Sequence, residues 1–240
     1  MQKKQWNSSY LCLLAVSFFS WLGYNMAAPV LVEYLTGLGL ALSVAGVISG
    51  LFAFASMGTR PLSGILTDRI NHKHLLIGAQ TVMAVSMLIY SIWPAPAILW
   101  IFRTLHGIAF AVSSTVSLVL ASEYTPPEKM AEGISYFSTA QIISMLLGPG
   151  LGIALAEAAG SYTCMLVSAA TTIPAVVLAC FLKEDKAEEK VRTETKKVRK
   201  IRLSDFIELP VVGLSMMNAS LTLMVGLGST FLVSFAAERG

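Results

Sequence analysis

The sequence predicts an all-α integral membrane protein. Three observations predict it: 55% of the 240 residues are hydrophobic, only 13% are charged, and long windows carry no charge at all. Charged residues usually make up about 25% of a soluble domain. Of the charged residues here, 14 fall within residues 183–202. The remainder has too few charges for a soluble fold, is too hydrophobic for disorder, and has three cysteines, an odd number for a disulfide framework.

Seven apolar segments are long enough to cross the hydrocarbon core, which takes about 20 residues in a helix. They span residues 10–31, 42–66, 75–93, 97–121, 133–157, 162–182 and 209–235. Pro94 and Pro96 separate the third segment from the fourth. Because lipid offers the backbone no hydrogen-bond partners, such segments must be helices, and barrel strands would be shorter and alternate in polarity.

Among the segments that connect the predicted spans, only every second one carries lysine or arginine. The N-terminal segment and the second, fourth and sixth connections carry 14 of them, and the odd-numbered connections carry none. The positive-inside bias predicts a multi-pass protein of the plasma (inner) membrane with a cytoplasmic N-terminus. The first segment also fits a cleaved signal peptide because of its basic start and the small pair Ala27-Ala28, although its apolar run continues to Val32.

The charged stretch divides the chain into three predicted parts. Residues 1–182 form a six-helix transmembrane bundle, 183–207 a cytoplasmic linker, and 208–240 the first helix of an incomplete second bundle. The basic residues of the linker fit a solvated segment beside anionic lipid headgroups. Within 183–202 no aromatic residue is available to stack on bases, so we expect no nucleic-acid partner.

Polar residues inside the predicted spans are candidates for substrate contact. Arg103 lies about 9 Å below the outer boundary, and placing it in lipid would cost at least about 2.5 kcal/mol, so it should face protein or water. His106 follows on nearly the same helix face. In the alternative, Arg103 snorkels to the interface and His106 only packs. The other candidates, which could instead bond between helices, are Tyr24, Asn25, Gln141 and Asn218.

A stripe of small residues marks the fifth span. Ser144, Gly148, Gly152 and Ala156 recur every four residues, and Pro149 lies beside them. Such a face allows a neighbouring helix to approach closely, and the proline permits a bend. The pattern predicts a tight helix contact, either static or conformational.

Residues 64–73 resemble the signature loop between the second and third helices of major facilitator superfamily transporters. The matching positions are Gly64, Leu66, Asp68, Arg69 and Lys73. Asn71 replaces a glycine there and is expected to keep a left-handed turn, since asparagine tolerates that backbone. His72 replaces an arginine, which weakens the positive charge.

Three further segments resemble the same family, most strongly its drug-efflux (proton antiporter) branch. They are Leu22-Gly23 with Pro29-Val30, Leu99 with Arg103 and Gly107, and Gly148-Pro149 with Gly152. The resemblance implies two inverted three-helix repeats that rock against a second bundle around a central cavity. It also implies that about five helices follow, so the chain is expected to be incomplete and its missing C-terminal half a partner.

The resemblance also implies roles for individual residues. Asp68 and Arg69, together with Arg60, would hold the cytoplasmic helix ends together. The Gly-Pro element of the fifth helix would pack against the other bundle, and Arg103 would take part in proton coupling. No Asp or Glu lies in the interior of a predicted span, and Glu157 stands at the end of the fifth. His106 therefore carries the proton, or the carboxylate lies in the missing half, or coupling is absent.

From these features we expect a secondary active transporter, with proton-coupled efflux of a small amphipathic or lipophilic compound by alternating access. An importer or facilitator of a polar metabolite such as a sugar is the alternative. A polytopic membrane enzyme is more remote, because clustered acid, base or metal-ligating residues are missing from the sequence pattern. We expect the bilayer, the substrate and H⁺ as partners, and neither a cofactor nor a metal.

Overall fold

The computed structural model describes residues 7–183, 213, 216, 217 and 220. Contacts divide the chain into two units, Met1–Thr193 and Glu194–Gly240, and each is considered by itself. The predicted seventh span and the linker lie outside the described residues, except for Lys183 and four helical positions: Gly213, Met216, Met217 and Ser220. The three-part division of the chain stays a prediction.

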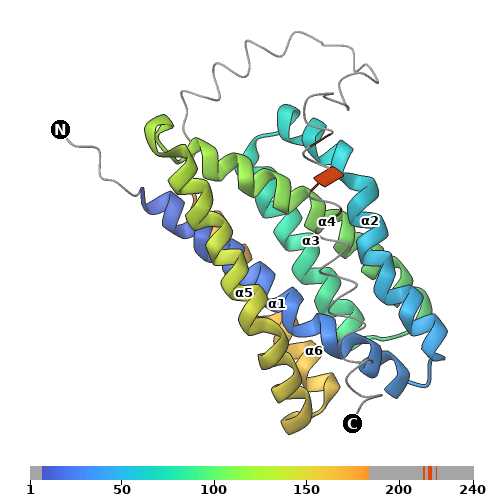
Figure 1. Cartoon of the computed structure of the whole chain (residues 1–240). Coiled ribbons are helices and arrows are strands. Elements are labelled where there is room, and N and C mark those ends of the chain that lie inside the picture. The colour runs from blue at the N-terminus through green and yellow to red at the C-terminus, as the bar shows by residue number, and fades with distance from the viewer. Residues whose placement is uncertain (1–6, 184–212, 214–215, 218–219, 221–240) are drawn as a thin grey trace. The chain divides into compact units, whose positions relative to one another are not determined.

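The first unit is a bundle of helices (Figure 1). The elements are α1 (Ser8–Gly37), α2 (Leu42–Arg69), α3 (His72–Ile92), α4 (Pro96–Glu123), the short 3-10 helix η1 (Pro127–Lys129), α5 (Met130–Ala159), α6 (Ser161–Ala170) and α7 (Ile173–Cys180). With α6 and α7 taken as one span, six helices among the described residues are long and apolar enough to cross a membrane. The first six predicted spans are thereby confirmed.

The connection between α2 and α3 differs from the expected turn. Helix α2 continues through Asp68 and Arg69, so that only Ile70 and Asn71 remain to join the two helices. Asn71 has φ −57° and its side chain accepts a hydrogen bond from the backbone of His74 at 3.2 Å. The expected left-handed turn at Asn71 is therefore wrong, because the residue is used as the N-cap of α3.

The sixth predicted span, 162–182, is not one continuous helix. It breaks between α6 and α7 at Thr171 and Thr172. Their hydroxyls donate to the carbonyls of Ser168 and Ala169, each at 2.7 Å, and so compete with the helical hydrogen bonds. Pro174 adds to the break because it has no N–H to donate.

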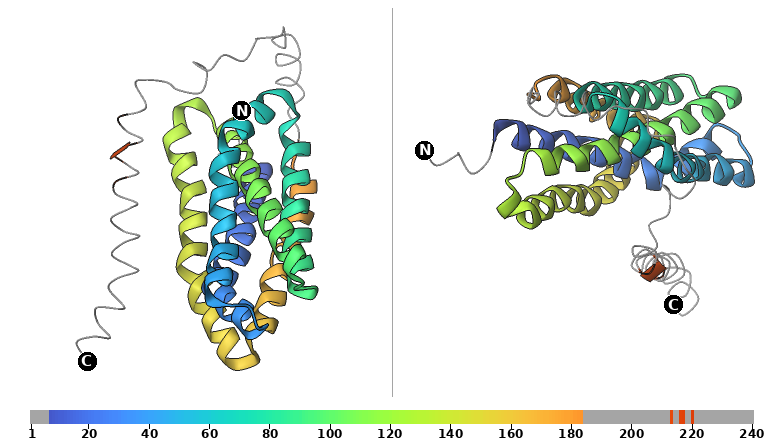
Figure 2. Two further views of the ribbon diagram at one scale, coloured as in Figure 1. Left: turned by 90° about the vertical axis from the view of Figure 1, so that its right-hand side faces the viewer. Right: turned by 90° about the horizontal axis from the view of Figure 1, so that it is seen from above.

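Helix pairing follows an internal exchange symmetry. Helix α1 packs mainly against α5 and α6, whereas α4 packs mainly against α2 and α3 (Figures 1 and 2). Exchanging α1, α2 and α3 for α4, α5 and α6 converts one set of contacts into the other. This pairing is what two intertwined three-helix repeats produce.

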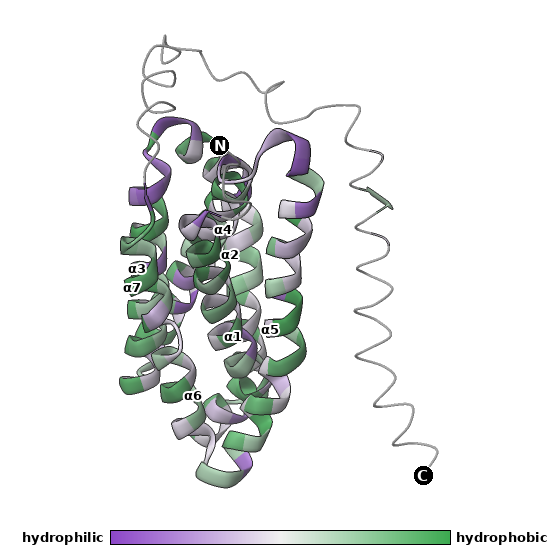
Figure 3. Cartoon of the chain, turned by 90° about the vertical axis from the view of Figure 1, so that its left-hand side faces the viewer, coloured by the Kyte–Doolittle hydropathy of each residue, from purple (hydrophilic) through white to green (hydrophobic). Residues whose placement is uncertain are grey.

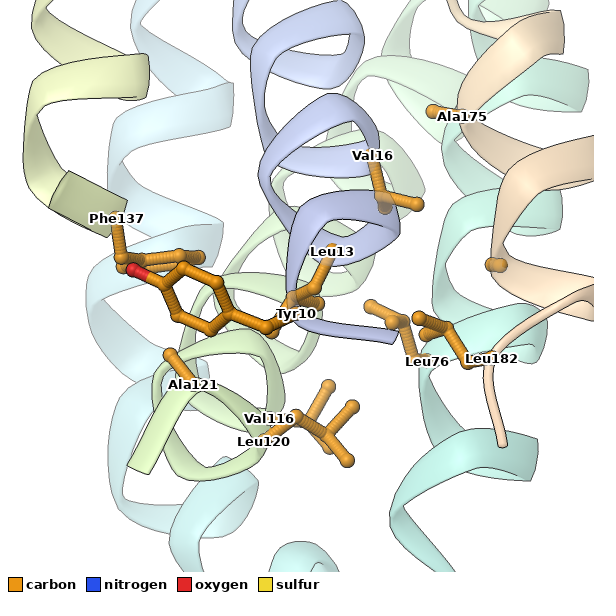
Figure 4. Close-up of a cluster of buried hydrophobic side chains, with 11 residues drawn as sticks. Tyr10, Leu13, Val16, Leu76, Val116, Leu120, Ala121, Phe137, Ala175 and Leu182 are labelled. Carbon is orange, nitrogen blue, oxygen red and sulfur yellow. The ribbon is translucent and has the colours of Figure 1, made fainter. Parts of the chain in front are cut away.

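Buried hydrophobic side chains fill the space between these helices. In one cluster, Tyr10 and Leu13 of α1 meet Leu76 of α3 and Phe137 of α5 (Figure 4). The Tyr10 hydroxyl donates to the carbonyl of Gly133 at 2.5 Å, so this buried phenol is satisfied. The cluster therefore packs helices of the first repeat against helices of the second.

Hydrophilic residues gather at one end of the bundle, and the middle of the helices is mostly hydrophobic (Figure 3). The start of α1 and the connections that follow α2 and α4 lie at the same end (Figure 2). Arg69 ends α2, Lys73 lies in the first turn of α3, and Lys129 lies in η1, so all three are in or beside these connections. The arrangement agrees with the alternation of basic connections in the sequence.

Candidate functional site

Arg103 of α4 lies in the interior of the bundle. Its side chain is only 4% exposed. The guanidinium carbon is 4.9 Å from the ring centroid of Phe52 on α2 and 6.0 Å from that of Tyr90 on α3. A cation over an aromatic face gains about 0.5 to 2 kcal/mol, depending on how far it is desolvated. Arg103 therefore faces protein, as the cost of exposing it to lipid predicts.

His106 follows Arg103 by nearly one helical turn and is 1% exposed. Its Nδ1 lies 3.2 Å from the hydroxyl of Tyr90. The rings of Phe52 and Tyr24 meet the imidazole edge to face, with centroid distances of 5.1 and 6.3 Å. We call Tyr24, Phe52, Tyr90, Arg103 and His106 the α4 cage; it joins the first four helices of the bundle.

Two polar atoms of the α4 cage have no hydrogen-bond partner within the described part of the chain. They are Nε of Arg103 and Nε2 of His106, and both are buried. The ion pair found among the described residues involves neither of them. Buried polar and charged groups are costly when unpaired, so most are satisfied. The exceptions identify the α4 cage as the strongest candidate for binding a substrate or a proton.

The remaining predicted substrate residues are spread over different places. Asn25 is 9% exposed and donates to the carbonyl of Trp21 at 2.8 Å. It lies against Gly148 of α5, and not in the α4 cage with Tyr24. Gln141 lines a separate small cavity. Asn218 lies outside the described residues.

A chain of neutral hydrogen bonds runs beside the α4 cage. Ser20 of α1 donates to Oε1 of Gln80 on α3 at 2.7 Å, and Nε2 of Gln80 donates to Ser113 of α4 at 2.9 Å. Next to this series of hydrogen bonds is the cavity that Gln141 lines, with a volume of about 10 Å³. The ring of Phe110 separates cavity and cage, because it lines the cavity and lies 5.5 Å from Tyr24.

The residues predicted to form the gate lie at the polar end of the bundle. Asp68, Arg69 and Arg60 are exposed, and Gly64 and Lys73 are half-buried. None of them forms an ion pair with another described residue. Their gating role stays a prediction.

A contact that does cross between helices at this end comes from His72. Its Nδ1 lies 2.5 Å from a carboxylate oxygen of Glu123 at the end of α4. Its Nε2 lies 2.9 Å from the carbonyl of Thr67 on α2. His72 therefore joins α2, α3 and α4 from the position where the family signature has arginine.

The small-residue stripe of α5 faces α1. Ser144 donates to the carbonyl of Phe18 at 2.9 Å. A Cβ added to Gly148 would lie 2.5 Å from the Cβ of Asn25, and one added to Gly152 would collide with the carbonyl of Met26. Within the described part of the chain these two glycines face α1, and the expected contact of the Gly-Pro element with a second bundle stays a prediction. Pro149 is half-buried beside them, and its role in bending stays a prediction.

Sequence reasoning missed several residues of these sites. Phe52 and Tyr90 are aromatic residues in apolar spans that also contain Phe54 and Trp93, and nothing in the pattern marks them out. Gln80 could have been found, since it is an amide in the third span just as Gln141 is in the fifth. Glu123 ends a helix on the side of the membrane where the predicted threading also puts His72, which was a usable signal. Among the described residues, no group of three or more His, Cys, Asp or Glu is placed to hold a metal.

The chain is similar to curated bacterial drug pumps. It is 31% identical over 150 residues to the multi-drug resistance efflux pump PmrA of Streptococcus pneumoniae, which covers 61% of this chain and 35% of that protein. It is 27% identical over 140 residues to the quinolone resistance protein NorA of Staphylococcus aureus, covering 58% of this chain and 36% of that protein. The matches span about a third of the length of these relatives.

Solved structures share the fold. The crystal structure of the peptide transporter POT in complex with sulfate superimposes with a TM-score of 0.67 at 14% identity and covers 92% of this chain and 46% of that one. At this identity only the fold is comparable. Residues 13–239 match the family model of the Major Facilitator Superfamily. The chain therefore belongs to the Major Facilitator Superfamily, a family of multi-pass membrane transporters and not of enzymes.

Proposed function

We propose that this chain works as a secondary active transporter that exports a small amphipathic or lipophilic compound in exchange for protons. It does so by alternating access, together with a second six-helix half, in a plasma membrane where the N-terminus is cytoplasmic. The family and the similarity to PmrA and NorA support this direction. The observation that carries the proposal is the α4 cage, in which Arg103 and His106 lie buried among aromatic rings.

The chemistry of the α4 cage fits exchange between a substrate and a proton. Aromatic faces bind flat lipophilic compounds, and Tyr24 and Phe52 already stack with a centroid distance of 4.5 Å. A proton on His106 would place a second positive charge in the cage beside Arg103, and the two charges would repel each other. Protonation and substrate binding then favour different arrangements of the same helices, which is the condition for coupling.

The polar end of the bundle supplies the contacts that alternating access needs. Helices α2, α3 and α4 meet there at His72 and Glu123. In the proposed cycle this contact holds the cytoplasmic side closed and opens when the bundle rocks. Arg60, Asp68 and Arg69 of α2 act with it.

The alternative of sugar transport has less support. Sugars are usually bound by several polar side chains around a cavity large enough for a ring. The neutral polar cavity here has a volume of about 10 Å³, which holds a single oxygen-sized group. The aromatic composition of the α4 cage favours a lipophilic substrate.

The experiment that tests the proposal is transport in liposomes by this chain together with the second six-helix half. Vesicles that are acidic inside should accumulate the amphipathic dye Hoechst 33342, and nigericin, which dissipates the pH gradient, should abolish the accumulation. Protein-free vesicles give the baseline. Accumulation equal to that baseline would reject export activity, whereas accumulation that survives nigericin would reject proton coupling alone.

A further inference from the structure

A cavity between α1, α3, α4 and α5 is distinct from the α4 cage. Its polar lining comes mainly from Ser17, Gln80, Ser113, Ser117 and Gln141. The volume of about 10 Å³ is close to the smallest that accepts one water-sized group. The cavity can therefore take a single functional group of a ligand and not the whole ligand.

The cavity has an excess of uncommitted hydrogen-bond donors. Ser17 is 3% exposed, and its Oγ has no hydrogen-bond partner in the described part of the chain. The Ser113 oxygen accepts from Gln80 at 2.9 Å, which leaves its own hydrogen available. Ser117 and Gln141 make no side-chain hydrogen bond to another described residue. Since a carbonyl oxygen can accept two hydrogen bonds, it is the group that this set of donors satisfies best.

The charge and shape of the cavity lining further restrict the class of ligand that fits. Among the residues that the structure describes, no charged side chain lines the cavity, so an ionic group would be buried there without compensation. The rings of Trp21 and Phe110 form an apolar wall, edge to face with centroids 5.1 Å apart. Because the cavity takes only the bound group, an aromatic ring attached to that group would lie outside the cavity, beside this wall.

We propose that this cavity is a subsite for the uncharged carbonyl group of an aromatic substrate, with Ser17 as its principal donor. The subsite selects among lipophilic compounds according to whether they carry a hydrogen-bond acceptor next to a ring. Its importance for transport rests on the function proposed above, but its binding preference does not require turnover.

The test is a binding comparison with the purified full chain in lipid nanodiscs. The probes are 2-acetylnaphthalene and 2-ethylnaphthalene, which differ by a carbonyl oxygen. Binding is measured by equilibrium dialysis, with empty nanodiscs to subtract partitioning into lipid. We expect the chain to prefer the ketone by about tenfold, as one to two additional neutral hydrogen bonds would give.

Substitutions test whether the preference for the ketone arises in this cavity. Ser17→Ala should lower it to about threefold or less, because one donor is lost. Gln141→Leu, at a half-buried position, should lower it as well and serves if Ser17→Ala fails to fold. Ser86→Ala is the control: Ser86 is a buried serine of α3 that does not line the cavity, and the preference should remain at the wild-type value.

Three results would overturn the subsite. The first is a wild-type chain that binds both probes equally or binds neither above empty nanodiscs. The second is an unchanged preference in Ser17→Ala and Gln141→Leu, and the third is an equal loss in Ser86→Ala. A failure of dye transport in liposomes with the binding preference intact would reject the proposed function and leave the subsite standing.

Discussion

The crossing of α1 with α5 and the crossing of α2 with α4 are equivalent contacts between the two repeats, yet they are built differently. At the first, Gly148 and Gly152 bring α5 onto the backbone of α1. At the second, a Cβ added to Gly107 of α4 would lie 2.5 Å from the carbonyl of Phe52 and 3.0 Å from the Cβ of Ala55 on α2. Both crossings use glycine to bring the backbones together.

The chemistry next to the glycines separates the two crossings. The α1–α5 crossing is neutral, with Ser144 bonded to the Phe18 carbonyl. The α2–α4 crossing contains Arg103, whose guanidinium carbon is 4.9 Å from the Phe52 ring. The same close approach thus serves packing at the α1–α5 crossing and brings an aromatic ring onto a buried cation at the α2–α4 crossing. We infer that the first crossing maintains the fold and the second carries the function.

The largest expected effect on stability is at the α1–α5 crossing. Gly152→Ala should lower the free energy of unfolding by about 3 kcal/mol, because the new methyl meets a backbone carbonyl that cannot move aside. Thermal or denaturant unfolding in detergent measures it. Gly150→Ala is the matched control on α5, where a Cβ would meet no atom of the described residues within 4 Å. Equal destabilisation by the two variants would show that the contact with α1 is not the cause.

The equivalent change at the α2–α4 crossing should destabilise the fold less but impair transport more. Gly107→Ala is expected to lower the free energy of unfolding by about 2 kcal/mol and to displace Phe52 from Arg103, which reduces dye transport. Gly58→Ala on α2 is the control, since a Cβ there meets no atom within 4 Å in the part of the chain that the structure describes. If transport by Gly107→Ala stayed at the wild-type rate after correction for folded protein, the link between this crossing and the α4 cage would be broken.

The polar end of the second crossing should contribute little to stability. Glu123→Gln removes the charge that faces His72, and the two side chains are 23% and 12% exposed. Partly exposed pairs contribute less than about 1 kcal/mol, so the loss in unfolding free energy should stay below that value and shrink further in high salt. A loss of several kcal/mol that is independent of salt would contradict this assignment.

The smallest effect on stability is expected for His106→Gln, where the change should appear in the pH dependence of transport. An amide keeps hydrogen bonding to Tyr90 possible but does not titrate near neutral pH. Initial rates of Hoechst 33342 accumulation across a series of external pH values provide the measurement. If the variant and the wild-type chain gave superimposable pH profiles, His106 would be excluded from the proton path.

The sequence predicted the features of the fold and the site that depend on composition. Six spans follow from apolar length, and the burial of Arg103 follows from the cost of a charge in lipid. The small-residue stripe predicted a close contact correctly.

Other features depend on how the helices rotate about their axes, which one sequence does not reveal. Gly148 and Gly152 face α1, and Phe52 and Tyr90 meet Arg103 only after three helices have packed. The cap at Asn71 and the break at Thr171 arise from side-chain hydrogen bonds to the backbone, which compete with local preferences that otherwise allow a turn or a continuous helix.

The most direct test of the central claim compares transport and stability of Arg103→Met in the same preparation. Methionine fills similar space without the unpaired charge, so the free energy of unfolding should change by less than about 1 kcal/mol or rise. Dye accumulation should fall at least about tenfold if Arg103 acts in the transport cycle. Retained accumulation, or a loss of accumulation that merely parallels a loss of stability, would contradict the assignment of function to the α2–α4 crossing.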